Sequence, residues 1–302
     1  MVMKRKAIRS VLYYLLIIAR FIIRLFPLGL GLFIGGILGR LAYYIVRKER
    51  IKTLANLRLA FGKEKSEKEI RRIGREVFAN LGKNLVELAD FPKINKSNIN
   101  TLVSENGLHK INKALGKKNG VIILASHFGN WELLAAYLTL KDYRGPVIAR
   151  KIYYEKYDRL LNDLRASKNV EVIYRDESPK KILRVLKSGG MIGILADQDV
   201  DSVEGVFVDF FGELAYTPTA PVSLALATGA QILPCFLIRE GNRRTFIVED
   251  PIELEISGNK ERDVAINTQK WSRVIESYLR KYPEQWVWMH RRWKTRPEDK
   301  NK

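Results

Sequence analysis

The chain has 302 residues, a hydrophobic fraction of 46% and a formal net charge of +20. This composition excludes a disordered or fibrous protein, and the length suffices for one large domain or two small ones. A surface this basic is expected to attract phosphates, anionic lipid headgroups or acidic proteins, and charge alone does not choose among them.

The first part of the chain is predicted to contact a membrane. Residues 11 to 46 form an apolar stretch that carries only Arg20, Arg24 and Arg40 as charges. The stretch is longer than a signal-peptide core and lacks a small-residue cleavage site, so we expect it to be retained. Because Pro27 and the arginines interrupt it, the sequence leaves open whether it spans the bilayer or lies in the interface. The remaining alternative is an ordinary buried helical hairpin.

We therefore divide the chain into a membrane-facing segment, residues 1 to 50, and one α/β domain, residues 51 to 302. The domain is expected to start with an amphipathic helix from Ser66 to Phe91, because Ser66 and Glu69 have the spacing of a capping box. Beyond it, short apolar runs alternate with helical patterns, which indicates a mixed sheet flanked by helices. The predicted strands are 121 to 125, 146 to 150, 170 to 174, 191 to 196, 231 to 238 and 244 to 249. The predicted helices between and after them are 131 to 140, 153 to 167, 178 to 187 (capped by Ser178) and about 264 to 281.

The cysteine and histidine content argues against a metal site. Cys235 is the single cysteine and lies in the apolar run QILPCFLI, so we expect a buried structural thiol. The three histidines, His109, His127 and His290, show no HExxH pattern and no paired cysteines accompany them. These residues lack the ligand spacings of transition-metal sites, and we predict neither a metal nor another cofactor.

The stretch VIILASHFGNWELLAAYL carries the chemistry that the sequence indicates. A predicted strand ends at Ala125 and a helix begins near Trp131, which places His127 in the connecting turn. Glu132 then falls in the first helical turn, from which its carboxylate can orient the imidazole of a general base. This arrangement suits the attack of a hydroxyl on a thioester, which needs no enzyme nucleophile. The alternative is a histidine satisfied in a loop, with Glu132 complementing the helix dipole.

No nucleophile elbow of the form GxSxG and no phosphate loop of the form GxxxxGK[ST] occurs in the sequence. The segment HFGNWE instead matches the His-x4-acid motif of the lysophospholipid-type acyltransferases. The chain resembles, nearly end to end, the lipid A biosynthesis acyltransferases within that superfamily. The resemblance also rests on NLRLAFG, ADQD, VFVDFFG, PTAPVSLALATGAQILP and the closing PEQWVWMHRRWKTRPE.

The resemblance implies that His127 is the general base and that Glu132 supports it. The implied donor is an acyl carrier protein, which is acidic, and the implied acceptor is a phosphorylated glycolipid at the cytoplasmic face of the inner membrane. Both partners agree with the basic net charge. Within the same chemistry, the alternative acceptors are another glycolipid or a glycerol phosphate. From a different class, the alternative is a non-catalytic basic protein that binds membranes or nucleic acid.

Other residues are candidates for substrate binding. Arg150 and Arg165 correspond by position to arginines of the family and are expected to bind the acceptor phosphate or the thioester carbonyl, with a solvated helix face as the alternative. Asp197 and Asp199 follow a buried strand and are expected to bind acceptor hydroxyls, with the capping of a turn as the alternative. Gly129 and Asn130, inside the motif, complete this group, and Gly129 is expected to let the backbone approach a substrate closely.

Two further segments have less specific patterns. Residues 217 to 219 are read as a helix start. Phe210, Phe211 and Gly212 are read as the wall of a pocket or as plain core, and the resemblance favours the wall. The tail combines three tryptophans with basic residues, which describes either single-stranded nucleic-acid binding or a membrane-interface belt. The resemblance favours the membrane belt, and we expect no nucleic-acid partner.

Overall fold

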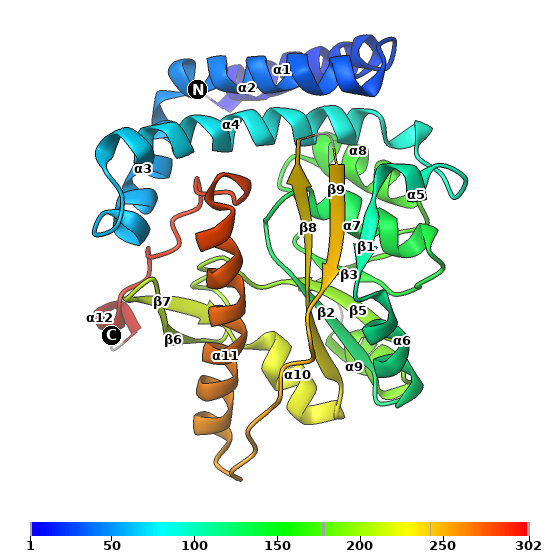
Figure 1. Cartoon of the computed structure of the whole chain (residues 1–302), viewed down its shortest axis with the longest axis vertical. Coiled ribbons are helices and arrows are strands. Elements are labelled where there is room, and N and C mark those ends of the chain that lie inside the picture. The colour runs from blue at the N-terminus through cyan, green and yellow to red at the C-terminus, as the bar shows by residue number, and fades with distance from the viewer. Residues whose placement is uncertain (1, 177–178, 242, 301–302) are drawn as a thin grey trace.

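Figure 1 shows the computed structural model of the chain, which describes residues 2–176, 179–241 and 243–300, with side chains from residue 10 to residue 299 within those ranges. Helices α1 (Val2–Ile23) and α2 (Leu28–Ile45) lie at one end of the molecule, and α4 (Glu67–Ala89) crosses beneath them. Helix α3 (Arg47–Phe61) connects α2 to α4. The α/β domain lies on the other side of α4, so α4 separates the apolar helices from the sheet.

The main sheet has seven strands in the order β1-β9-β8-β2-β5-β3-β4. Strands β8, β2, β5, β3 and β4 are parallel, whereas β9 is antiparallel to β8, so the predicted mixed sheet is confirmed. The strands are β1 (Ser104–Asn106), β2 (Val121–Ala125), β3 (Val147–Ala149), β4 (Val172–Tyr174), β5 (Met191–Leu195), β8 (Gln231–Glu240) and β9 (Arg243–Val248). The helices around them are α5 (Ile99–Leu102), α6 (Leu108–Gly116), α7 (Trp131–Leu140), α8 (Glu155–Ala166), α9 (Pro179–Lys187), α10 (Ala220–Thr228) and α11 (Lys260–Lys281).

The predicted elements agree with these bounds to within a few residues. The capping box of α4 is present, because the Ser66 side chain accepts from Glu69 N–H while the Glu69 carboxylate accepts from Ser66 N–H. The predicted cap Ser178 of α9 lies outside the described residues. The short strand β1 and the hairpin of β6 (Gly205–Phe210) and β7 (Glu213–Pro218) were not predicted. The expected helix start at 217 is three residues early, because Thr217 and Pro218 pair with β6 and α10 starts at Ala220.

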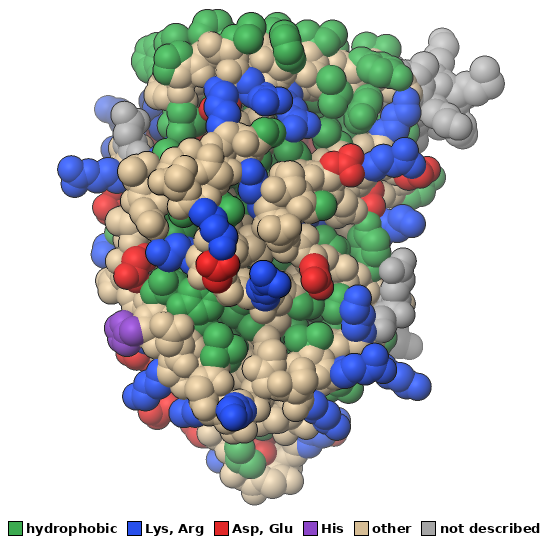
Figure 2. Space-filling view, turned by 90° about the vertical axis from the view of Figure 1, so that its right-hand side faces the viewer, with side chains coloured by type: hydrophobic (Ala, Val, Ile, Leu, Met, Phe, Trp, Pro, Cys, Tyr) green, Lys and Arg blue, Asp and Glu red, His purple; other side chains and the backbone are tan. Residues whose placement is uncertain are grey.

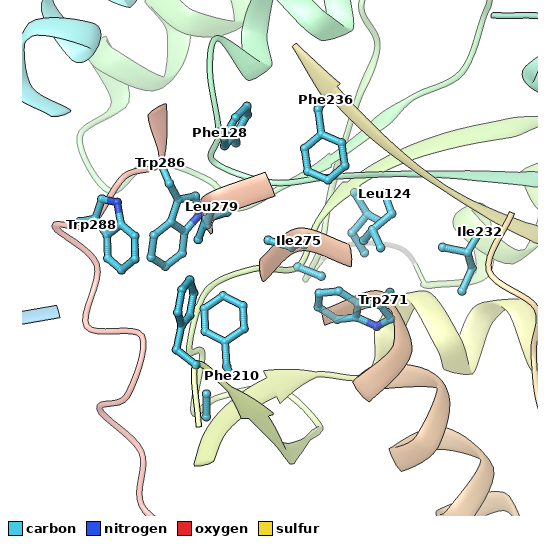
Figure 3. Close-up of a cluster of buried hydrophobic side chains, with 14 of the residues drawn as sticks. Leu124, Phe128, Phe210, Ile232, Phe236, Trp271, Ile275, Leu279, Trp286 and Trp288 are labelled. Carbon is cyan, nitrogen blue, oxygen red and sulfur yellow. The ribbon is translucent and has the colours of Figure 1, made fainter. Parts of the chain in front are cut away.

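The core explains why the central strands are apolar along their whole length. All five residues of β2 are buried, and alternate ones enter different clusters on the two faces of the sheet. Helices cover both faces, so no side of β2 meets water. Figure 3 shows one of these clusters, in which Leu124 of β2 and Ile232 and Phe236 of β8 face Trp271 and Ile275 of α11.

The tail after α11 corrects one prediction. Trp286, Trp288 and Trp293 are 1%, 0% and 4% exposed and belong to the core in Figure 3, so they form no belt at a membrane interface. Phe210 and Phe211 pack among the same rings and are core residues, not a pocket wall. Three short elements complete the chain. The 3-10 turn η1 (Phe91–Lys93) follows α4, the 3-10 turn η2 (Pro283–Gln285) begins the tail after α11, and the helix α12 (Pro297–Lys300) lies at its end.

Helix α2 presents an apolar stripe outward. By length and composition alone, α2 could cross a membrane. One of its faces is buried against α4, and the opposite face is exposed. The exposed apolar residues of that face include Leu30, Phe33, Ile37, Leu41 and Tyr44. Figure 2 shows hydrophobic side chains gathered at this end of the molecule, with a row of Lys and Arg side chains directly beneath.

Glycines allow α2 to approach α4 closely. A Cβ atom on Gly35 would lie 2.9 Å from the Gly82 carbonyl oxygen and 2.6 Å from a Val86 methyl group. A Cβ atom on Gly39 would overlap the Phe78 carbonyl oxygen and lie 2.8 Å from the Ala79 Cα. Because these neighbours are largely backbone atoms of α4, they cannot move without displacing one helix from the other.

We therefore expect Gly39→Ala to destabilise the contact between α2 and α4 by about 1–3 kcal/mol, the usual cost of overpacking. Gly29→Ala is the matched control, because Gly29 lies in the same helix and a Cβ there would have nothing within 4 Å. Thermal unfolding of both variants in the same detergent measures the difference. Equal melting temperatures would mean that the close approach of the two helices contributes nothing to stability.

Candidate active site

His127 lies where two neighbouring parallel strands end. It is the second residue after β2, and Asp197 is the second residue after β5, which pairs with β2. The carboxyl ends of parallel strands meet at one edge of a sheet, where the sites of α/β proteins form. The two side chains therefore come together although 70 residues separate them in the chain.

Asp197 holds His127 by two contacts. Its Oδ1 lies 2.8 Å from the imidazole Nδ1, and its Oδ2 accepts a hydrogen bond of 2.9 Å from the His127 backbone N–H. Oδ2 also accepts a hydrogen bond of 2.7 Å from the indole Nε1 of Trp286. Because both carboxylate oxygens are occupied, the orientation of the carboxylate and of the imidazole ring is fixed.

The environment keeps Asp197 ionised. Burial by itself raises the pKa of this carboxyl group, but the neighbouring His127 and the hydrogen bonds from His127 and Trp286 outweigh it and lower the pKa to about 2. An ionised Asp197 accepts a hydrogen bond from Nδ1–H, which leaves the lone pair of the neutral ring on Nε2. The His127 side chain is 22% exposed.

Two rings flank the imidazole. The Trp131 ring centre lies 5.1 Å from that of His127 in an edge-on arrangement, and the His290 ring centre lies 5.5 Å away. Burial, and after it the neighbouring His127, lowers the pKa of His290, which favours the neutral form of its ring.

The structure corrects the expected partner of His127. Glu132 makes a two-point ion pair with Arg165, with distances of 2.8 and 2.6 Å from its carboxylate oxygens to Nε and Nη2. No hydrogen bond joins Glu132 to His127 in the described part of the chain, and Asp197 occupies Nδ1 instead. The same ion pair engages Arg165, which was expected to bind substrate. It ties the first turn of α7 to α8, with side-chain exposures of only 13% and 10%.

The turn that carries His127 is fastened to α4 and β8. Gly129 has a φ of +56°, and a Cβ there would overlap the Leu237 carbonyl oxygen, so its close approach is to β8 rather than to a substrate. Asn130 uses both ends of its amide within the protein, because Nδ2 donates to Glu87 at 2.7 Å and Oδ1 accepts from Leu133 N–H at 3.0 Å. Both residues, which were expected to bind substrate, hold the turn in place.

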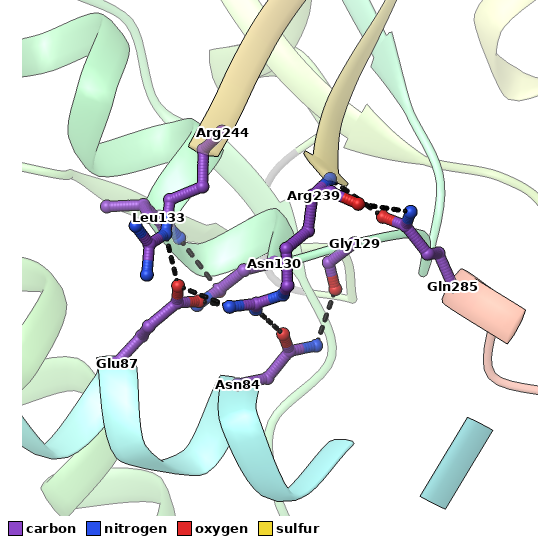
Figure 4. A network of polar contacts seen from close by, with 8 residues as sticks. All are labelled: Asn84, Glu87, Gly129, Asn130, Leu133, Arg239, Arg244 and Gln285. Atoms are coloured by element: carbon purple, nitrogen blue, oxygen red, sulfur yellow. Dashed lines mark hydrogen bonds and ion pairs between the residues drawn. The ribbon is translucent and has the colours of Figure 1, made fainter. Parts of the chain in front are cut away.

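Figure 4 shows the polar network around Glu87, a fully buried carboxylate of α4. Glu87 accepts hydrogen bonds from Asn130, from Arg244 and, at 2.7 Å, from both terminal nitrogens of Arg239. Asn84, one turn earlier in α4, donates to the Gly129 carbonyl oxygen. Helix α4 therefore connects the helices at the apolar end of the molecule to the turn that carries His127.

Comparison with known proteins identifies the family. The family model for bacterial lipid A biosynthesis acyltransferases matches residues 2–295. The chain belongs to this family. The lauroyltransferase of lipid A biosynthesis from Escherichia coli is 28% identical over 280 residues, which cover 91% of this chain and 86% of that protein. The myristoyltransferase of lipid A biosynthesis from Escherichia coli is 25% identical over 86% of this chain and 79% of its own length. A phosphatidylinositol mannoside acyltransferase of Mycobacterium tuberculosis is 27% identical over 62% of this chain and 58% of its own length.

The region matched by the acyltransferase family ends at a contact with the site. Thr295, its last residue, donates from its backbone N–H and its hydroxyl to Asp199, at 2.6 and 2.7 Å. Asp199, expected to bind acceptor hydroxyls, thus fastens the tail, and Asp197 in turn holds Trp286 of the same tail. Arg150, after β3, is exposed and is the predicted substrate-binding arginine that stays available at the surface.

The Glu87 network leads to a prediction on stability. Glu87→Gln keeps the shape of the side chain but leaves Arg239 and Arg244 without their buried counter-charge, which typically costs about 3–5 kcal/mol. Glu155→Gln is the control, because Glu155 pairs with Arg159 on the surface, where such a pair contributes about 0–1 kcal/mol. Urea unfolding measures both free energies, and similar values for the two variants would contradict a stabilising function of the network.

Proposed function

We propose that this protein transfers a fatty acyl chain from an acyl carrier protein thioester to a hydroxyl group of a lipid A precursor, at the cytoplasmic face of the inner membrane. The observation that carries the proposal is the pair of His127 and Asp197 at the sheet edge, in which no hydrogen bond from the described residues reaches the imidazole Nε2. Membership of the acyltransferase family supports this class of reaction, and the basic net charge suits an acidic carrier protein and a phosphorylated acceptor.

In the proposed reaction His127 is the general base. Its Nε2 takes the proton from the acceptor hydroxyl as the oxygen attacks the thioester carbonyl carbon. The ionised Asp197 stabilises the imidazolium that forms. When the tetrahedral intermediate collapses, the carbon–sulfur bond breaks and the imidazolium returns the proton to the leaving thiolate. The products are an ester on the acceptor and the free thiol of the carrier.

Glu132 is proposed to act indirectly, through its ion pair with Arg165. The pair fixes the first turn of α7, which directly follows the turn of His127, and the adjacent Trp131 packs on the imidazole. Glu132 is thus proposed to position the site rather than to orient His127 directly. Arg150 is proposed to bind a phosphate of the acceptor, because its exposed guanidinium lies after β3, which neighbours β5 in the sheet.

The arrangement of α1 and α2 supports a location on the membrane surface. A helix that lies lengthwise on the globular domain offers lipid one stripe, whereas a spanning helix is surrounded by lipid or by other spanning helices. We therefore propose that residues 1 to 50 lie in the interface and bring the edge with His127 to the level of the lipid headgroups.

Mass spectrometry of the product tests the function. The purified protein is incubated with an acylated carrier protein and one of two acceptors, a lipid A precursor or phosphatidylinositol mannoside. The mannoside is included because one relative of this chain is a phosphatidylinositol mannoside acyltransferase. The proposal expects the lipid A precursor to gain one acyl chain while free carrier thiol appears. Thiol release without an acylated lipid, or acylation of the mannoside alone, would overturn it.

A further inference from the structure

A large cavity lies at the junction of α2, α3 and α4, away from the residues that contact His127. Its volume is about 730 Å³, which is within the range of about 300–1,000 Å³ found for small-molecule sites. Seven of its eleven lining residues are basic and none is acidic. Helix α3 contributes Arg47, Arg50 and Arg58, and the first half of α4 contributes Lys68, Arg71, Arg72 and Arg75.

Carboxylates next to the cavity neutralise only part of this charge. Glu67 pairs with Arg58 at 2.6 Å and with Arg71 at 2.9 Å. Glu76 lies 3.8 Å from Arg75 but makes its shorter contact, 2.7 Å, with Arg40.

The other cations of the cavity form no ion pair with any described carboxylate. Arg50 donates to the Tyr44 carbonyl oxygen at 3.3 Å, and its guanidinium lies 5.5 Å from the centre of the Tyr43 ring. Across the described ranges, no carboxylate forms an ion pair with Arg47, Lys68 or Arg72. Cations gathered around a hollow without counter-charges repel one another, and an anion in the hollow would remove that repulsion.

The cavity and the active site lie on opposite faces of α3. Asn56 donates to the carbonyl oxygens of Trp288, at 2.7 Å, and of His290, whose ring lies beside His127. Asn56 and residues 49 and 52, whose charges act on His290, form this face, whereas residues 47, 50, 51, 54 and 58 line the cavity. At about 100° per residue, the mean directions of the two sets differ by about 180°. The basic cavity is therefore a separate site, one helix away from the reaction.

The edge of the cavity is apolar and continuous with the membrane-facing surface. Tyr44 and Ile51 line the cavity and are 58% and 54% exposed, and Ile45 and Val46, at the end of α2, are 79% and 42% exposed. A ligand with an anionic head and acyl chains matches both parts, because the head can enter the hollow while the chains follow the exposed apolar residues.

We propose that this cavity between α3 and α4 binds the phosphate-bearing headgroup of an anionic phospholipid of the bilayer. The bound headgroup holds the end of α2 at the interface and fixes the height of α3 relative to the membrane. This site requires no acyl donor or acceptor, so it can be tested apart from the reaction.

The test is sedimentation of the full chain with vesicles of phosphatidylcholine alone or mixed with phosphatidylglycerol. The double variant Arg47→Gln/Arg72→Gln removes two cavity cations that form no ion pair within the described ranges. The expected loss of affinity for the phosphatidylglycerol vesicles is about fivefold for each arginine, with binding to phosphatidylcholine unchanged. Arg144→Gln/Arg273→Gln is the control, because both residues are exposed on the α/β domain and the net charge changes equally. Circular dichroism confirms that both double variants fold.

Each other outcome overturns the proposal. Equal losses in the two double variants would mean that vesicle binding reports overall charge rather than this cavity. Protection of the wild-type protein against thermal unfolding by inorganic phosphate, as strong as that by phosphatidylglycerol, would assign the cavity to a free anion. Unchanged vesicle binding of Arg47→Gln/Arg72→Gln, with a raised KM for the acylated carrier protein, would assign the basic residues to the donor protein.

Discussion

Replacement of His127 by alanine is expected to lower acyl transfer by about 10²- to 10⁴-fold, the usual contribution of a positioned general base. The acceptor hydroxyl would then have to lose its proton to water during the attack on the thioester. His127 lies in a turn and keeps 22% of its side chain exposed, so we expect the variant to fold. The measurement is kcat/KM with an acylated carrier protein and a phosphorylated glycolipid acceptor.

His109→Ala is the matched control for this experiment, because His109 is exposed on α6 and carries no proposed function. It is expected to retain the wild-type rate. The membrane binding of both variants should match that of the wild-type protein, whereas the melting temperature should fall only in His127→Ala, because that variant takes a hydrogen-bond partner from the buried Asp197. Undiminished transfer by His127→Ala would remove the general base from the mechanism.

Local sequence patterns were sufficient to predict most of the elements. The strand at 121 to 125 is uniformly apolar because both faces of β2 are covered. The capping box at Ser66 indicates the start of the helix that follows it. The position of His127 in a strand-to-helix turn follows from the same local signals. These features depend on residues close together in the chain, which is why periodicity and capping chemistry reveal them.

The partner of His127 could not be found in this way. Which carboxylate reaches Nδ1 depends on β5 being the neighbour of β2, and sheet order is a long-range property. Glu132 was the nearest acid in the sequence, but its side chain is held by Arg165 on α8. A usable signal was present, because Asp197 follows a buried apolar strand just as His127 does, and such strand ends gather at one edge of a parallel sheet.

The membrane belt predicted for the tail was wrong for a different reason. Tryptophans among basic residues occur in a membrane belt, and they also occur in a core in which the cations bind carbonyl groups. Composition does not distinguish these two structures. Arg292 is 1% exposed and donates to the Tyr216 carbonyl oxygen at 2.6 Å, while its guanidinium lies 4.8 Å from the centre of the Phe210 ring. The hairpin of β6 and β7 supplies these partners, and it was not predicted. Without the hairpin, the sequence offered no buried partner for the tail.

Asp197→Asn is expected to reduce kcat/KM by a similar order, about 10²- to 10⁴-fold, through the tautomer of His127. Oδ2 of Asp197 accepts from two N–H groups, those of the His127 backbone and of Trp286. An asparagine would keep its oxygen at that position and turn its NH₂ group toward Nδ1. The imidazole would then accept at Nδ1 and carry its proton on Nε2, which is the wrong tautomer for a base.

Glu132→Gln provides the contrast, because it removes a carboxylate of the motif that has no hydrogen bond to His127. Its expected effect is a lower melting temperature and a smaller loss of kcat, since Arg165 loses a counter-charge while the imidazole keeps its tautomer.

The pKa of Asp197, about 2, is depressed, so its contribution to stability is complete at neutral pH and is lost only as the pH falls toward that value. Asp197→Asn should therefore lower activity across the neutral range without a new ionisation in its pH profile. A larger loss of kcat in Glu132→Gln than in Asp197→Asn would return the orienting function to the acid of the motif.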